Sequence, residues 1–322
     1  MDKQILLKLY SQMLRIRLIE EKIAEIYPQQ EIRCPVHLCI GQEAIPVGVC
    51  AQLTSEDYIM SNHRSHGHYL AKGGDLKSMM AELFGKRSGC CSGKGGSMHL
   101  VDISAGFLGS MPIVGSSIPI AVGAALGSVM QGRSRITVVF FGEGATEEGV
   151  FQESINFAVL KNLPIVFVCE NNLYSVYSPL SVRQPAGREV FRVAESLGIE
   201  SYQGDGNDIF EVYRFAEQAV HKARENRGPT FLEFKTYRWL EHCGPNYDND
   251  LGYRTNHEFN DWKKRCPLAQ MREYLLQEQL FSGVEEDGIV NEINREIDGA
   301  ICYAKESPFP GKQFLLEHIY AS

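Results

Sequence analysis

The sequence lacks the features that mark several classes of protein. No apolar run approaches the roughly 18 residues that a membrane-spanning helix needs. There is no basic tract, and 32 Lys and Arg against 40 Asp and Glu give a net charge of −8, which argues against a protein that wraps nucleic acid. Internal repeats, low-complexity segments and linkers are also missing, so solenoids and multi-domain arrays are not expected.

The cysteines and the N-terminus exclude further classes. The 9 cysteines form no C-x-x-C pair and their number is odd, so we expect neither a disulfide framework nor a structural zinc site. The first 27 residues thread charges through their apolar positions, unlike a signal peptide. These features predict a soluble cytoplasmic protein with reduced thiols, unless a transit peptide has been removed.

The 322-residue chain contains segments typical of apolar strands that alternate with segments typical of helices. Buried strands are predicted at 136–141, 164–169 and 230–236, and helices at 147–160, 187–197 and 208–226. This alternation predicts an α/β fold, in which a parallel sheet carries helices on both faces.

Helices are also predicted before this alternation, at 5–26, 42–53 and 76–84, and a glycine-rich loop follows at 85–99. Pro28 ends the first of these helices. We expect one domain over residues 1–322, with a helical arm at 1–28 and a helical tail at 256–322.

Two polar loops follow neighbouring predicted strands. The loop at 142–146 places Glu143 between Gly142 and Gly144 at the start of a helix, where free N–H groups suit an anion. The loop at 170–174 brings Asn171 and Asn172. Ligands of parallel sheets bind beyond the carboxyl ends of the strands, and Mg²⁺ prefers carboxylate, amide and phosphate oxygens. Either loop alone is usually a plain turn, but together they predict a phosphate and magnesium site.

A third polar segment holds His63, Arg64, His66 and His68 within six positions. One interpretation of the spacing H-x-x-H-x-H is a transition-metal site. However, no acidic residue lies within this segment, and Arg64 would repel a cation. A clamp in which Arg64 holds phosphate oxygens is the favoured interpretation. His66 and His68 are then structural or lie behind the site.

Taken together, these motifs resemble the alpha subunit of the thiamine-diphosphate-dependent first component of 2-oxo acid dehydrogenase complexes. Pyruvate, branched-chain 2-oxo acid and acetoin dehydrogenases belong to that family. The resemblance rests on HLCIGQEA at 37–44, HRSHG at 63–67, GKGGSMH at 93–99, IVG at 113–115, FGEGATEEG at 141–149, ENNLYS at 170–175 and TYR at 236–238.

The resemblance implies that the two loops bind thiamine diphosphate and Mg²⁺. Glu143 and Asn172 would be side-chain ligands of the metal, and Tyr174 would contribute its backbone carbonyl. The turn from Gly142 through Gly144 to Ala145 would hold the diphosphate. The family usually has Asp at the position of Glu143, so weaker metal affinity, or its loss, is expected.

Further residues of the cofactor site follow from the same resemblance. His63 and Arg64 would contact the diphosphate, with His63 in the place of a usual Tyr. Backbone groups of Pro112 and Val114 would meet the aminopyrimidine ring, and Pro112, which replaces a frequent Gly, keeps only its acceptor.

Two histidines are implied to be catalytic. The resemblance places His37 near the substrate end of the cofactor, although a buried structural role is the alternative. His242 matches the loop histidine that meets the diphosphate and assists acyl transfer, with Glu241 and Cys243 departing from the family pattern around it. Cys243 replaces a serine that is phosphorylated in some relatives, so that regulation is not expected.

No residue matches the carboxylate that protonates the aminopyrimidine ring. In two-chain members of the family a beta subunit supplies it, which implies an α2β2 heterotetramer whose active site lies between the subunits. Gly123 and Gly127, on one helix face, and the loop at 85–98 are the expected contact surfaces. A lipoyl-bearing acyltransferase would be a further partner.

Three functions remain open. The first is the alpha subunit of a 2-oxo acid (pyruvate-like) or acetoin dehydrogenase that passes an acyl group to lipoamide. The second is a thiamine-diphosphate enzyme subunit that acts outside a lipoyl complex, for instance in a carbohydrate pathway, which the unusual segment at 240–255 motivates. The third is a non-catalytic scaffold that has lost the metal site through Glu143.

Overall fold

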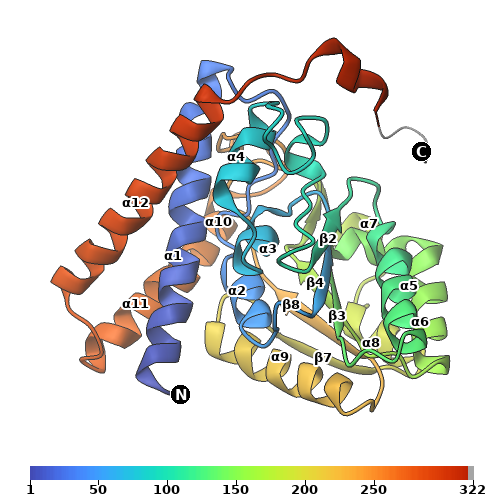
Figure 1. The fold of residues 1–322 in the computed structure, drawn as a ribbon. Helices are drawn as coiled ribbons and strands as arrows, with labels where there is room; N and C mark the ends of the chain where they lie inside the picture. The colour runs from blue at the N-terminus through green and yellow to red at the C-terminus, as the bar shows by residue number, and fades with distance from the viewer. Residues whose placement is uncertain (318–322) are drawn as a thin grey trace.

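A six-stranded parallel sheet forms the centre of the computed structural model, which describes residues 1–317 (Figure 1). The strands lie in the order β2-β1-β3-β4-β8-β7. Their bounds are β1 Tyr58–Ser61, β2 Phe107–Ser110, β3 Thr137–Gly142, β4 Ile165–Asn171, β7 Glu200–Asp205 and β8 Thr230–Lys235. A separate two-stranded antiparallel ribbon pairs β5 (Tyr174–Ser175) with β6 (Ser178–Pro179).

Helices cover both faces of the sheet because alternate residues of the strands enter two cores. Val166 and Val168 of β4 face one core, and Ile165 and Phe167 face the other. The first core is shared with α2 (Ala44–Cys50) and α9 (Ile209–Arg224). The second core is shared with α5 (Ser117–Met130), α6 (Gly149–Leu160) and α8 (Val190–Glu195), and α5 and α6 form the outer right side of Figure 1.

The first helix and two of the last helices of the chain pack together on the side of the molecule opposite to α5 and α6 (Figure 1). The first helix, α1 (Lys3–Ile26), contacts α11 (Pro267–Gln277) and α12 (Gly283–Glu306), and Tyr10 donates a hydrogen bond of 2.5 Å to Glu286. The helical tail predicted at 256–322 corresponds to α10 (Asn256–Lys264), α11, α12 and the 3-10 helix η4 (Lys312–Leu316), and residues 318–322 lie outside the described residues.

Short helices make up the rest of the chain. They are α3 (His66–Ala71), α4 (Leu76–Leu83), α7 (Leu180–Arg183) and the 3-10 helices η1 (Tyr27–Gln29), η2 (Gly96–Met98) and η3 (Glu143–Glu147). No helix among residues 1–317 combines the length and the apolar character needed to cross a membrane.

The predicted α/β fold is confirmed, and the differences are local. The strands predicted at 136–141, 164–169 and 230–236 are β3, β4 and β8. The helices predicted at 147–160, 187–197 and 42–53 are shorter, as α6, α8 and α2, because turns and 3-10 segments take up their ends. Strands β1, β2 and β7 were not predicted, since β1 and β2 have four residues each and β7, at the sheet edge, is mostly polar.

The glycine-rich loop after α4 is ordered around one carboxylate. The buried side chain of Glu82 accepts hydrogen bonds of 2.7 to 3.0 Å from four backbone N–H groups, those of Cys91, Gly93, Gly95 and Gly96. A buried carboxylate needs such donors, and here they close the loop over the end of α4.

Candidate cofactor site at the carboxyl edge of the sheet

The carboxyl ends of five adjacent strands converge on one cavity. Its walls come from the segments that follow β1, β2, β3, β4 and β8, which is where parallel sheets place their ligands. The predicted site residues that line it are His63, Arg64, Val114, Gly142, Glu143, Gly144, Ala145, Asn172, Tyr174 and His242. The structure therefore brings together residues that lie up to 179 positions apart in the sequence.

Glu143 lies at the start of the 3-10 helix η3, directly after β3, with its carboxylate almost completely buried. Burial raises the pKa of Glu143 above its ordinary value, against the opposing effect of Arg183. The guanidinium of Arg183 donates a 2.5 Å hydrogen bond to this carboxylate and also pairs with Glu147. A positive charge thus already stands beside the predicted metal ligand.

Asn172 and Tyr174 lie in the tight turn after β4. The Oδ1 atom of Asn172 accepts a 3.3 Å hydrogen bond from the backbone N–H of Tyr174, and its Nδ2 atom lies 3.4 Å from Oε1 of Gln42. Between them Leu173 has a left-handed φ of 74°, a conformation that costs a branched apolar residue free energy. The turn is therefore held in one shape, which fixes the amide and carbonyl oxygens that it presents.

His63 and Arg64 follow β1. Arg64 is buried, and its guanidinium donates hydrogen bonds to the backbone carbonyls of Leu38, at 2.6 Å, and His242, at 3.1 Å. Burial and the charge of Arg238 lower the pKa of Arg64 to about 10, so it stays charged near pH 7. Arg64 therefore joins three segments of the site and presents a positive charge to the cavity.

His37 does not line the cavity but lies directly behind two residues that do. Its ring centroid is 4.6 Å from that of His63 and 5.1 Å from that of His242. Burial, together with the nearby Arg64, lowers the pKa of His37 to about 2, that of His63 to about 4 and that of His242 to about 3. All three imidazoles are therefore neutral near pH 7.

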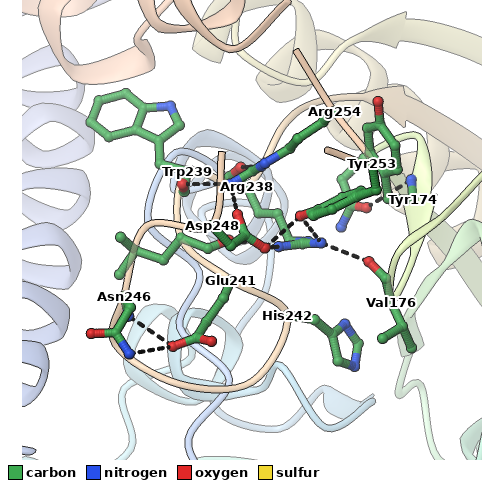
Figure 2. A network of polar contacts seen from close by, with 12 residues as sticks. Tyr174, Val176, Arg238, Trp239, Glu241, His242, Asn246, Asp248, Tyr253 and Arg254 are labelled. Carbon is green, nitrogen blue, oxygen red and sulfur yellow. Dashed lines mark hydrogen bonds and ion pairs between the residues drawn. The ribbon is translucent and has the colours of Figure 1, made fainter. Parts of the chain in front are cut away.

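The loop that carries His242 is held by a buried carboxylate between two arginines (Figure 2). Asp248 pairs with Arg254 and lies 3.6 Å from Arg238, and all three side chains are at most 3% exposed. Arg254 also donates to the backbone carbonyls of Arg238 and Trp239, at 2.8 and 2.9 Å. These bonds tie residues 238 to 254 into a closed loop.

The same network reaches the turn after β4. The guanidinium of Arg238 donates a 2.7 Å hydrogen bond to the backbone carbonyl of Val176, two residues beyond Tyr174 (Figure 2). Near the tip of the loop Glu241 accepts 2.9 Å hydrogen bonds from the backbone and the side chain of Asn246. The unusual Glu241 thus closes the turn that presents His242.

Other predicted residues have different environments. Pro112 lies between two lining residues, Met111 and Ile113, but is not itself part of the cavity wall. His66 bonds to Glu20 at 2.6 Å and to Ser97 at 2.8 Å, and His68 lies 2.8 Å from Ser61 and 3.2 Å from Glu170. Both ring nitrogens of His66 are bonded and Nδ1 of His68 is bonded to Ser61, and neither residue lines the cavity, which favours structural roles over the H-x-x-H-x-H metal site.

Sequence reasoning missed several residues of the cavity. Gln42 and Glu170 belong to motifs quoted for the resemblance, but no role was assigned to them. Outside the cavity wall, the roles of Arg183, Asp248 and Arg254 were not foreseen, because no periodic pattern in the sequence marks contacts that span 10 to 40 positions.

Comparison with known proteins shows the family of the chain. The family model described as "Dehydrogenase E1 component" matches residues 11–313. The chain is 38% identical, over 98% of its length and 93% of the relative's, to the alpha subunit of acetoin:2,6-dichlorophenolindophenol oxidoreductase from Bacillus subtilis (strain 168). It is 36% identical, over 100% of its length and 94% of the relative's, to the pyruvate dehydrogenase E1 component subunit alpha of Porphyra purpurea.

A third relative, the pyruvate dehydrogenase E1 component subunit alpha of Rickettsia bellii (strain RML369-C), is 35% identical over 99% of this chain and 96% of its own. The fold, the cavity and these full-length similarities together establish that the chain belongs to the dehydrogenase E1 component family.

Proposed function

We propose that this chain is the alpha subunit of a thiamine-diphosphate-dependent 2-oxo acid or acetoin dehydrogenase. The observation that carries the proposal is the shared cavity, in which Glu143, Asn172 and Arg64 meet at the carboxyl ends of adjacent strands. The names of the relatives, which include pyruvate and acetoin enzymes, support the same class of substrate.

The oxygen atoms of the cavity fit a magnesium ion. A buried carboxylate, an amide oxygen and a backbone carbonyl, from Glu143, Asn172 and Tyr174, are the hard ligands that Mg²⁺ takes together with phosphate oxygens. The guanidinium of Arg183 occupies this carboxylate in the structure and competes with the ion for it. Metal binding then requires that Arg183 move away from Glu143.

The remaining cavity residues fit a diphosphate. Gly144 has no side chain, and a Cβ atom added there would lie 2.9 Å from Oγ of Ser175, so the backbone approaches closely. Arg64 supplies a fixed positive charge, and neutral His63 and His242 offer N–H donors to phosphate oxygens. In this proposal Gly142 and Ala145 complete the turn, and Val114 and Pro112 present backbone groups to the pyrimidine end.

The bound cofactor supplies the reactive carbon and the electron sink for decarboxylation or carbon–carbon cleavage. The residues of this chain hold and orient its diphosphate end. His242 lines the cavity and His37 lies behind it, both as neutral imidazoles, the form that accepts a proton and can return it once protonated. Both are proposed to move protons during acyl transfer.

A beta subunit is the proposed partner, with an α2β2 assembly and a lipoyl-bearing acyltransferase as further proposals. Exposed apolar side chains on α5 and near the cavity support such an interface, among them Ile113, Val114, Ile120, Val129 and Met130. Gly123 and Gly127 have no neighbouring atom within 4 Å of an added Cβ, so their helix face is open to a partner. We also propose that residues 1–322 act as one cofactor-binding domain, because α1 packs against α12.

We also propose that the protein is located in the cytoplasm, and the state of its cysteines supports this location. All 9 cysteines are free thiols, a state that the cytoplasm maintains.

Reconstitution tests the proposed function. The chain, purified with its beta subunit, is assayed with pyruvate, branched-chain 2-oxo acids and acetoin, using 2,6-dichlorophenolindophenol as an artificial electron acceptor. We expect turnover of at least one substrate that needs both subunits, thiamine diphosphate and Mg²⁺. Turnover with the dye but not with lipoamide would favour an enzyme outside a lipoyl complex.

A non-catalytic scaffold is the second candidate function, and the ion pair between Glu143 and Arg183 favours it, because the pair occupies the carboxylate that the metal needs. The absence of turnover with every substrate, together with formation of a stable complex with the beta subunit, would support the scaffold instead.

A further inference from the structure

Three imidazoles from three separate segments meet at the inner end of the cavity. The ligand atoms of His37, His63 and His242 all lie within 4.8 Å of one another. Their ring centroids are 4.6 to 5.2 Å apart, with the rings turned edge to face. This cluster differs from the H-x-x-H-x-H segment in the sequence, of which only His63 takes part.

The cluster has unused hydrogen-bonding capacity. His37 is 7% exposed, and its Nδ1 atom is buried without a hydrogen-bond partner among the residues that the structure describes. A buried polar atom without a partner costs free energy, so such atoms call for an explanation. In contrast, both ring nitrogens of His66 are bonded to Glu20 and Ser97, which removes that histidine as a ligand.

We propose that His37, His63 and His242 form a binding site for one divalent transition-metal ion of the zinc type. Three imidazole ligands and one open position are a standard coordination for Zn²⁺, with Zn–N distances of about 2.0–2.1 Å. The open position faces the cavity, because His63 and His242 line its wall. Small rotations of these two half-buried side chains bring the nitrogens to bonding distance around one ion.

Arg64 sets the strength and the geometry of this site. Its Nη2 atom lies 3.5 Å from Nδ1 of His242, which leaves Nε2 of His242 as the ligand atom. The guanidinium charge opposes a second cation nearby, so the site is weaker than one made of three histidines alone. We therefore expect a dissociation constant in the micromolar range.

The site has a consequence for the proposed cofactor. His63, Arg64 and His242 also line the space that the diphosphate would take. On the assumption of the proposed function, the metal ion and thiamine diphosphate compete, and micromolar Zn²⁺ inhibits the enzyme. Binding of the ion itself does not depend on that function.

Cobalt absorption provides the test. The full-length chain, free of other metals, is titrated with Co²⁺ and the visible spectrum is recorded, since four-coordinate Co²⁺ absorbs much more strongly than hydrated Co²⁺. We expect an intense band that saturates at one ion per chain and that Zn²⁺ abolishes. His63→Tyr, which removes one ligand but keeps an aromatic ring, and His37→Gln should each weaken binding at least tenfold.

Matched controls separate this site from adventitious binding. His221→Gln and His257→Gln change histidines that are 71% and 89% exposed, and both should bind Co²⁺ like the unmodified chain. Circular dichroism shows whether each variant is folded. If His63→Tyr does not fold, His37→Gln remains as the ligand variant. A weak spectrum of the octahedral type, or equal affinity in the unmodified chain and in the folded ligand variants, would overturn the inference.

Competition distinguishes this inference from the proposed function. Thiamine diphosphate with Mg²⁺ should displace Co²⁺ and bleach the band. Binding of Co²⁺ through the three histidines, with no binding of thiamine diphosphate even when the beta subunit is present, would contradict the proposed function and leave the metal site standing.

Discussion

At the scale of single residues, Glu143 and Arg183 define what is particular to this site. The glutamate brings a longer side chain than the aspartate that the family resemblance leads one to expect, and Arg183 holds its carboxylate at 2.5 Å. The arginine stands on α7, outside the sheet, so it can leave without disturbing the strands. The pair is therefore a competitor for the metal rather than part of the core.

Replacing Arg183 with Gln should lower the stability of the cofactor-free chain and increase its affinity for the metal. The buried carboxylate of Glu143 loses its counter-ion, which should lower the free energy of unfolding by about 1 to 3 kcal/mol. The same loss removes the competing cation, so the Mg²⁺ concentration that supports half-maximal cofactor binding should fall about tenfold. Thermal unfolding and calorimetry measure the two effects. Arg188→Gln, at an exposed arginine on the same segment, is the control and should change neither.

The three neutral histidines predict acid sensitivity. Their folded-state pKa values of about 2, 4 and 3 lie below the ordinary value of 6.5, so the unfolded chain binds more protons below pH 6.5. Stability is therefore unaffected above that pH and falls as the pH drops toward 4, by up to about 1.4 kcal/mol per pH unit for each histidine.

Urea unfolding at a series of pH values checks this dependence. His63→Tyr should show a shallower loss of stability between pH 6.5 and 4 than the unmodified chain, whereas His221→Gln, at an exposed site, should show the same loss. An identical pH dependence for His63→Tyr would mean that His63 titrates normally in the folded chain.

At the scale of elements, the loop between β8 and α10 owes its shape to one buried carboxylate. Asp248 lies between Arg238 and Arg254, and Arg238 continues to the carbonyl of Val176 beside the turn after β4 (Figure 2). The loop that presents His242 and the turn that presents Tyr174 are therefore one connected unit.

Asp248→Asn should release this loop. The substitution leaves two buried guanidinium groups without a counter-ion, and the free energy of unfolding should fall by about 3 to 5 kcal/mol. Limited proteolysis should cut within residues 239–253, and hydrogen exchange there should accelerate while the sheet stays protected. Asp250→Asn, two residues away and exposed, should leave the loop intact. Equal protection in both variants would show that Asp248 does not hold the loop.

The elements also show how far sequence reasoning extends. Strands β3 and β4 were predicted because most of their residues are apolar, and β8 because Phe231, Leu232 and Phe234 lie close together in it. The loops after β3 and β4 were recognised because glycine, glutamate and asparagine lie where those strands end. Strand β7 was missed because its sequence, ESYQGD, is polar and partly exposed at the sheet edge.

Contacts between segments that are distant in the sequence could not be predicted from such patterns. Arg183 meets Glu143 across 40 positions, and the ring of His37 packs against that of His242 across 205, and which residues meet at such separations depends on tertiary packing. The resemblance to a known family supplied His37 and His242 as residues of one site, but not Arg183, Asp248 or the clustering of three imidazoles.

At the scale of the whole molecule, part of the exposed apolar surface lies on α5, where we propose that the chain meets its partner. Ile120, Val129 and Met130 are exposed on α5, on the side of the molecule opposite to α1 and α12 (Figure 1). Exposed apolar side chains of this kind are a feature of interaction sites.

Val129→Asp should therefore prevent assembly with the beta subunit without unfolding the chain. A charge on an interface core is costly to bury, whereas the exposed position tolerates it in the isolated subunit. Light scattering coupled to size exclusion measures the mass of the complex. Val284→Asp changes an 82% exposed valine on α12 and should assemble normally, and normal assembly of Val129→Asp would place the interface elsewhere.

The most direct test of the account is calorimetric titration of thiamine diphosphate, with Mg²⁺ present, into the chain together with its beta subunit. The account predicts one cofactor per alpha chain, an absolute need for Mg²⁺, and loss of binding in Glu143→Ala, which lacks the carboxylate at the carboxyl end of β3. Absence of binding at millimolar cofactor, or binding by Glu143→Ala that is as tight as that of the unmodified chain, would contradict it.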